Sequence, residues 1–162
     1  FFCDVSSVNI MVLMHIMGTY IKNITLEYVD QCILIQKNDG FKHAYYLTKE
    51  RFERLFKNGE QFFGAFTPDN RLIGFASINM DAVRLRIHFF FVDKRYQGKG
   101  IGSDLLCHIL DIAKNEKVMN IYTYTEVDSP LEQFLLHSGF EKAGYFKKRF
   151  GDKDANILSR YL

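Results

Sequence analysis

Alternating apolar and polar positions predict several β-strands along the chain. Residues 20–24 alternate, and the segments 62–66 and 72–80 are rich in aromatic and aliphatic side chains. The turn Thr67-Pro68-Asp69-Asn70 lies between these two segments, where proline presets the backbone and short polar side chains close the turn. The two segments are therefore predicted to form an antiparallel hairpin.

The segment 83–92 is predicted to be the next strand, with one apolar face and one partly polar face. The odd positions from 85 are all large and apolar: Leu85, Ile87, Phe89 and Phe91. The even positions up to 88 are cationic or titratable: Arg84, Arg86 and His88. We expect the apolar set to share one side of a sheet and to pack in the core.

Two helices are predicted before the hairpin, because apolar residues recur there at helical spacing. Thr25 offers an N-cap to the first helix, which carries Val29, Ile33 and Leu34 on one side. The second is capped by Thr48, and its apolar residues are Phe52, Leu55 and Phe56.

Two more helices and three strands are predicted in the second half of the chain. One helix follows a glycine-rich segment and starts near Ser103. The other starts at Ser129-Pro130, which combines a capping serine with proline at the first helical position, and ends at Ser138-Gly139. The remaining strands are expected at 118–123, 142–148 and 156–161.

The resulting order, β-α-α-β-β-β-α-β-α-β-β, describes an α/β fold with a mixed sheet and helices packed on it. We expect one domain over residues 19–162. Residues 1–18 are interpreted as an N-terminal extension, which is either foreign to the domain or an additional strand or arm. The 162 residues are 48% hydrophobic, which is enough for a substantial core.

Charge and cysteine content narrow the functional class. The formal charge of +2 arises from 21 basic and 19 acidic residues, without the basic block that nucleic-acid binding requires. The apolar stretch 8–17 is too short to span a membrane. Cys3, Cys32 and Cys107 lack the spacing of a metal or redox site, and we expect reduced thiols in a cytoplasmic protein without a bound metal.

The segment Gln97-Gly98-Lys99-Gly100-Ile101-Gly102 is the main candidate for a binding site. Between a strand and a helix, its glycines allow close backbone approach and its N–H groups can bind phosphate. Lys99 is followed by Gly100, so the segment is not a P-loop, and no acidic residue follows at the distance that a dinucleotide site needs. A glycine-rich turn without a ligand is the structural alternative.

The same segment resembles the pyrophosphate loop of the GNAT acetyltransferases, with Gln97, Gly100 and Gly102 at the matching positions. Ser138-Gly139-Phe140 also resembles the end of that family's last helix. The resemblance implies an N-acetyltransferase that moves an acetyl group from acetyl-coenzyme A (acetyl-CoA) to a primary amine of a small molecule or peptide, and it leaves a homodimer open.

By this resemblance, the cofactor would be held by the loop and by the end of the preceding strand. The residues implied are Phe91, Val92, Gln97, Gly98, Lys99, Gly100, Ile101, Gly102 and Ser103. The thioester would lie where the strand at Phe91 separates from the strand at Ile121.

His88 is the first candidate for a general base, because imidazole titrates near neutral pH and its strand approaches the expected thioester. A histidine with a purely structural place in the strand is the alternative. Glu126 is the second candidate, with a solvated loop carboxylate as its alternative. Deprotonating a lysine-like amine at pH 7 costs about 4.6 kcal/mol, and an α-amine about 1.4 kcal/mol.

The family's usual thiol-protonating tyrosine would fall at Leu135, so Tyr124, Tyr122 or Tyr145 would have to replace it. The last segments are also similar to the ribosomal-protein N-terminal acetyltransferases. However, their catalytic glutamate would fall on Thr123. The competing hypothesis is a catalytically weak acyl-CoA-binding regulatory or interaction module.

Overall fold

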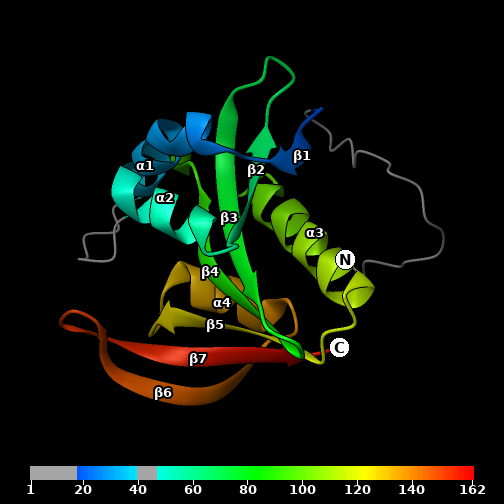
Figure 1. Ribbon diagram of the computed structural model, residues 1–162. Helices are drawn as coiled ribbons and strands as arrows, with labels where there is room; N and C mark the ends of the chain where they lie inside the picture. Colours follow the sequence, from blue (N-terminus) through cyan, green and yellow to red (C-terminus); the bar gives the residue numbers. More distant parts are fainter. Residues whose placement is uncertain (1–17, 40–46) are drawn as a thin grey trace.

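The computed structural model describes residues 18–39 and 47–162, which form a mixed sheet flanked by helices (Figure 1). The strands are β1 (Tyr20–Asn23), β2 (Gln61–Phe66), β3 (Leu72–Met80), β4 (Arg84–Val92), β5 (Asn120–Glu126), β6 (Glu141–Phe150) and β7 (Lys153–Tyr161). The helices are α1 (Val29–Asn38), α2 (Lys49–Lys57), α3 (Ile101–Asn115) and α4 (Pro130–His137), with 3₁₀ turns η1 (Leu26–Tyr28) and η2 (Lys94–Tyr96). This order confirms the predicted element order and fold class.

The strands of the described sheet lie in the order β1-β2-β3-β4-β5-β7-β6. All neighbours are antiparallel except β4 and β5, which are parallel and are connected through α3. The hairpin of β2 and β3 is confirmed by pairs such as Phe63 with Ala76. The predicted extension at residues 1–18 lies, apart from Gly18, outside the described residues.

Helices cover both faces of the sheet, and each face has its own hydrophobic core. One core joins α3 and α4 to the strands and includes Leu105, Ile109 and Leu135. The other joins α1 and α2 to the opposite face and is rich in phenylalanine, including Phe52 and Phe62. Full burial of such a side chain contributes about 1.5–3 kcal/mol, so both layers stabilise the sheet that carries the site.

The predicted helix ends are largely confirmed. Thr48 Oγ1 accepts a hydrogen bond from the Arg51 backbone N–H at 3.2 Å, and Ser129 Oγ accepts one from Glu132 at 3.2 Å. Gly139 takes φ +84°, the left-handed conformation expected after a helix.

The predicted inner side of the first helix was partly wrong. The side chain of Leu34 is 57% exposed, and the residues that face the core are Val29, Cys32, Ile35 and Gln36. Thr25 forms no side-chain cap, because the 3₁₀ turn η1 follows it and delays the α-helix until Val29. Leu34 points outward because it lies five positions after Val29, which is about 140° around the helix.

The predicted alternation along the fourth strand fails at His88. Ser77 of β3 pairs with Phe89 and Ile78 pairs with Ile87, so His88 is an extra residue that forms a β-bulge. Beyond the bulge the faces exchange: Ile87 belongs to the α3–α4 core, whereas Phe89 belongs to the α1–α2 core. The four apolar residues therefore do not share one face.

The cysteines differ in their oxidation state. Cys32 is a buried free thiol, but Cys107 is disulfide-bonded, so the prediction of reduced thiols was wrong for Cys107.

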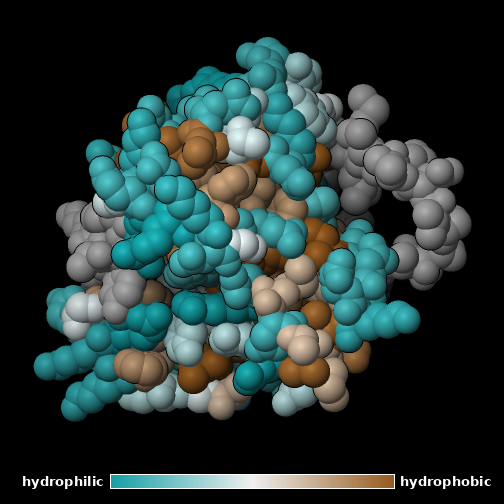
Figure 2. Space-filling model, in the orientation of Figure 1, coloured by the Kyte–Doolittle hydropathy of each residue, from teal (hydrophilic) through white to brown (hydrophobic). Residues whose placement is uncertain are grey.

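No helix within residues 18–39 and 47–162 has the length and hydrophobicity needed to cross a bilayer. Figure 2 shows mostly hydrophilic side chains over α1 and α2, and a mixture of hydrophilic and hydrophobic ones along the lower edge, over β6 and β7. Tyr145 and Phe146 of β6 are exposed.

Candidate active site

A cavity of about 1200 Å³ opens where β4 and β5 separate. The two strands pair only from Arg84 to Arg86 on β4 and from Asn120 to Tyr122 on β5. Beyond these residues the facing edge of β4 has no partner strand in the described sheet. Typical small-molecule pockets measure about 300–1,000 Å³, so this cavity has room for two substrates.

The glycine loop forms one end of the cavity. Gly98 has φ +72° and Gly100 has φ +87°, conformations that favour glycine. Gly100 is the N-cap of α3, and the Asp104 N–H donates to its carbonyl at 3.0 Å. The N–H groups at the start of a helix lack partners within that helix, so this end of the cavity suits an anion.

Gln97 fixes the loop against its surroundings. Its side-chain Nε2 donates to Asp39 Oδ1 at 2.8 Å and to the Val92 carbonyl at 3.0 Å. The side-chain nitrogen is therefore used within the protein, and Gln97 acts on the loop by holding its entry beside β4.

Most of the predicted cofactor residues line this one cavity: Phe91, Val92, Gln97, Gly98, Gly100, Gly102 and Ser103. Two differ. The ammonium group of Lys99 lies 5.3 Å from the centre of the Tyr96 ring, and Ile101 is 2% exposed within the core. For Lys99 and Ile101, only the backbone is suited to the predicted contact.

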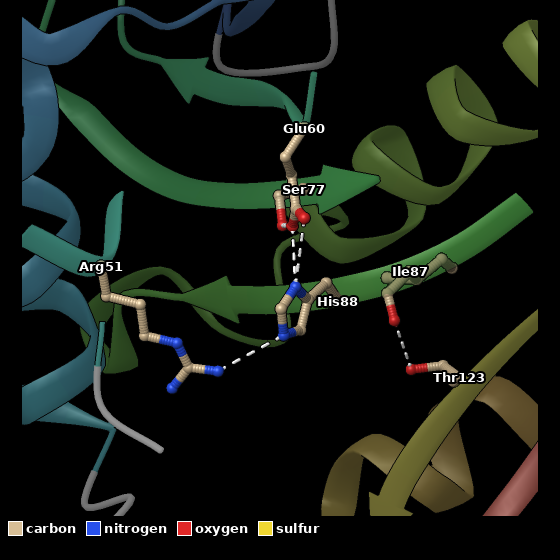
Figure 3. A network of polar contacts seen from close by, with 6 residues as sticks. All are labelled: Arg51, Glu60, Ser77, Ile87, His88 and Thr123. Atoms are coloured by element: carbon tan, nitrogen blue, oxygen red, sulfur yellow. Dashed lines mark hydrogen bonds and ion pairs between the residues drawn. The ribbon is translucent and has the colours of Figure 1, made fainter. Parts of the chain in front are cut away.

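His88 lies at the centre of a polar network (Figure 3). Its Nδ1 is 2.9 Å from Glu60 Oε1 and 3.2 Å from Oε2, and Ser77 Oγ donates to the same carboxylate. Its Nε2 lies 3.4 Å from a guanidinium nitrogen of Arg51. Glu60 is only 5% exposed, so the pair with His88 is shielded from water.

This arrangement favours one tautomer of a neutral imidazole. A carboxylate only accepts hydrogen bonds, so Nδ1 carries the proton that is shared with Glu60. The lone pair of Nε2 then points toward Arg51, which lines the cavity. A contact of 3.4 Å is long for a hydrogen bond, so Nε2 can exchange it for a contact with a ligand.

The β5 side of the cavity carries the other two catalytic candidates. The Tyr124 ring lies 5.2 Å from the guanidinium carbon of Arg86 and 5.0 Å from that of Arg149. Glu126 Oε1 lies 3.1 Å from the ammonium group of Lys153. His88, Tyr124 and Glu126 line the same cavity, although they come from two strands.

Leu135, Tyr145 and Tyr122 do not line this cavity, whereas Thr123 does. Leu135 is 1% exposed in the core, so its position offers no proton to the cavity. Tyr145 donates to Asp154 on β6–β7, and Tyr122 lines a separate cavity of about 270 Å³. Thr123 Oγ1 donates to the Ile87 carbonyl at 2.9 Å, at the point where β4 and β5 separate (Figure 3).

Sequence reasoning missed Glu60, Ser77 and Arg51, which surround His88. Glu60 precedes β2, Ser77 lies within β3 and Arg51 belongs to α2. The one local signal was a polar residue, Ser77, between the apolar residues Ala76 and Ile78 of the strand. The described residues contain no group of three or more His, Cys, Asp and Glu that could hold a metal ion.

The fold and the cavity define a class of protein. A sheet with two separating central strands, beside a glycine loop that begins a helix, is the arrangement of an acetyltransferase. A model described as the acetyltransferase (GNAT) family matches residues 27–140, which is more than half of the chain. The chain therefore belongs to the GNAT acetyltransferase family, which confirms the predicted family and supports acetyl-CoA as its cofactor.

The chain is also similar in sequence to an individual protein described as a probable N-acetyltransferase. The chain is 32% identical over 109 residues to the probable N-acetyltransferase YjcK of Bacillus subtilis, covering 65% of this chain. It spans 59% of that relative's length.

Solved structures support the fold. Ard1 from Thermoplasma volcanium has a TM-score of 0.80 at 18% identity, covering 89% of this chain and 97% of that one. The ribosomal-protein-S18-alanine N-acetyltransferase of Escherichia coli has a TM-score of 0.77 at 19% identity, covering 89% and 94%. The PaiA N-acetyltransferase of Thermoplasma acidophilum, in complex with coenzyme A, has a TM-score of 0.73 at 19% identity, covering 90% and 100%.

Proposed function

We propose that this protein transfers the acetyl group of acetyl-CoA to a primary amine of a small molecule or peptide. The observation that carries this proposal is that His88, whose ring is held by Glu60, lines the same cavity as the glycine loop. When bound, acetyl-CoA supplies a thioester carbon that an amine can attack, with a thiol as the leaving group.

The backbone from Gly98 to Ser103 would hold the pyrophosphate. Positive φ angles at Gly98 and Gly100 expose successive N–H groups there, and each charge-assisted hydrogen bond contributes about 1.5–3 kcal/mol. The edge of β4 at Phe91 and Val92 would bind the pantetheine arm, because its β5-facing side is not paired with β5.

His88 is proposed to remove the proton from the amine through Nε2. Glu60 holds the ring through Nδ1 and favours the positive charge that the imidazole gains in this step. Because deprotonating an α-amine costs about 3 kcal/mol less than a lysine-like amine at pH 7, we propose an α-amine or another amine of low pKa.

Tyr124 is the proposed proton source for the departing thiolate, since it lines the cavity and Leu135 lies in the core. Glu126 also lines the cavity and is the second candidate for the base, although Lys153 neutralises its charge at 3.1 Å. Separate substitutions of Tyr124 and Glu126 would distinguish the proton donor from the alternative base.

A thiol-release assay with acetyl-CoA and a panel of α-amines, alkylamines and peptides tests the proposal. We expect acceptor-dependent release of coenzyme A, and mass spectrometry should show the acetylated amine. Tight binding of acetyl-CoA without turnover across the panel would contradict the proposal and favour a catalytically weak acyl-CoA-binding module.

A further inference from the structure

Arg86 lies at the base of the opening between the two central strands. It is the last β4 residue that pairs with β5, where it faces Tyr122. The next residue on the partly polar side of β4 is His88, and both side chains line the main cavity. Arg86 is thus placed beside the proposed base on the cavity wall.

One hydrogen-bond donor of Arg86 has no partner within residues 18–39 and 47–162. This donor is its Nε, which is buried. The guanidinium group packs 5.2 Å from the centre of the Tyr124 ring. Among the described residues it also forms no ion pair. A buried donor without a partner costs about 1–3 kcal/mol, which a ligand could recover.

The carboxylates near Arg86 are committed to other groups. Glu60 binds His88 at 2.9 Å, Asp81 pairs with Arg84 at 3.4 Å, and Glu126 pairs with Lys153 at 3.1 Å. Each of these three carboxylates, which share a cavity lining with Arg86, thus has another charged partner.

Two more guanidinium groups face the same space. Arg149 lies 5.0 Å from the same Tyr124 ring, and Arg51 lies 3.4 Å from His88 Nε2. Both line the main cavity together with Arg86. The carboxylates of Asp39, Glu126, Asp128 and Asp152 line the cavity too, so the preference for an anion rests on the surroundings of Arg86 and not on the charge of the whole cavity.

We propose that Arg86 binds a carboxylate of the acceptor, so that the acceptor is an amine with a carboxylate a few bonds away. This inference rests on the proposed function and names its acceptor class: an amino acid, or a peptide with an acidic residue next to its terminal amine. Guanidinium Nε and a terminal nitrogen together bind a carboxylate in a two-pronged contact. Arg86 and His88 are two residues apart on β4 and both line the cavity, so one small acceptor can place its amine at His88 and its carboxylate at Arg86.

The first test compares matched acceptors with the unmodified protein. Alanine is compared with alaninamide, and the dipeptide alanyl-aspartate with alanyl-asparagine; each pair differs in one carboxylate. We expect kcat/KM to be at least 10-fold higher for the acidic member of one pair, and the pair that responds identifies the source of the carboxylate. Equal kcat/KM within both pairs would overturn the inference.

The second test uses Arg86→Met, which keeps most of the side-chain length and removes the charge. We expect KM for the acidic acceptor to rise by about 10–100-fold, with a smaller change in kcat and almost none for the neutral acceptor. Arg84→Met is the matched control, since Arg84 lies on the same strand, pairs with Asp81 and does not line the main cavity. An equal loss for acidic and neutral acceptors would contradict a carboxylate contact.

A second variant and a binding measurement test the carboxylate contact even if Arg86→Met does not fold or the protein shows no turnover. If Arg86→Met does not fold, Arg86→Lys keeps the charge but lacks the two-pronged contact, and should weaken the preference only in part. Ligand-observed NMR with the same acceptors measures binding without catalysis. Arg86-dependent binding of the acidic member in a protein without turnover would support this inference while the proposed function fails, whereas equal binding of both members would overturn it.

Discussion

His88 Nδ1 lies 2.9 Å from Glu60 Oε1, although 28 residues separate the two in the sequence. Glu60 stands just before β2, and the β-bulge in β4 turns His88 toward it. The carboxylate fixes the imidazole so that Nε2 points toward the cavity side of the network, at Arg51. Because His88 and Glu60 lie outside the glycine loop, the proposed base can be tested without altering that loop.

Replacing His88 by glutamine should lower the acetyl-transfer rate by about 100-fold or more, because it removes the titrating group and keeps much of the volume. Acetyl-CoA affinity, measured by calorimetry, should be unchanged. The pH–rate profile should also lose its step in the range near pH 6.5, where imidazole ordinarily titrates.

His137→Gln is the matched control, because His137 is exposed on α4 and its Nδ1 hydrogen-bonds the Gln133 backbone. An acceptor amine of different pKa must be compared as well, since a step that moves with the amine belongs to the acceptor. Full activity and an unaltered pH profile in His88→Gln would refute the assignment.

Glu60→Gln should lower kcat by roughly 10-fold with little change in acetyl-CoA affinity, because Glu60 acts on catalysis only through His88. Ser77→Ala, which removes only the hydroxyl that donates to Glu60, should act in the same direction and less strongly. An unchanged kcat in Glu60→Gln, or an equal loss of acetyl-CoA affinity, would contradict this role for Glu60.

Gly98→Val should abolish acetyl-CoA binding measured by calorimetry, because a side chain would enter the proposed pyrophosphate loop. Gly151→Val is a close control: φ is +72° at Gly98 and +73° at Gly151, and an added Cβ meets no atom within 4 Å at either position. Both variants should lose about 1–2 kcal/mol of stability from backbone strain. Similar acetyl-CoA affinities in two folded variants would show that the loop is not the binding site.

Glu132→Gln should destabilise the fold by about 1–3 kcal/mol at pH 7, since a buried donor loses its acceptor. Glu132 is fully buried and accepts from the Asn156 side chain and the Asp128 N–H, and Lys142 lies 3.3 Å away. Burial alone would raise the pKa of Glu132, but these three contacts outweigh it and lower the pKa.

The stabilising effect of a carboxylate with a lowered pKa is present above its ordinary value of about 4.3 and is lost as the pH falls through the folded-state value. The difference between Glu132 and the glutamine variant, measured by urea unfolding, should therefore shrink in acid. A difference that stays constant from pH 7 to pH 3 would contradict a charged Glu132 in the folded protein.

Much of the fold could be predicted because its signals are local. The helix α4 begins at Ser129 and ends before Gly139 as the sequence indicates, because a capping hydroxyl and a left-handed glycine act on their own neighbours. The glycine-rich segment likewise indicated a helix after it, although α3 starts at Ile101, two residues before the predicted start near Ser103.

The sequence by itself determined the order of the elements, the GNAT resemblance and the glycine loop, since each depends on residues a few positions apart. Only the tertiary structure decided that His88 is a bulge residue, because a bulge arises from the register between β3 and β4. It also decided that Glu60 and Arg51 are neighbours of His88, and that the buried Nε of Arg86 has no partner in the described part of the chain. These features depend on which distant segments pack together, and hydrophobic periodicity within a single segment does not indicate which other segment it contacts.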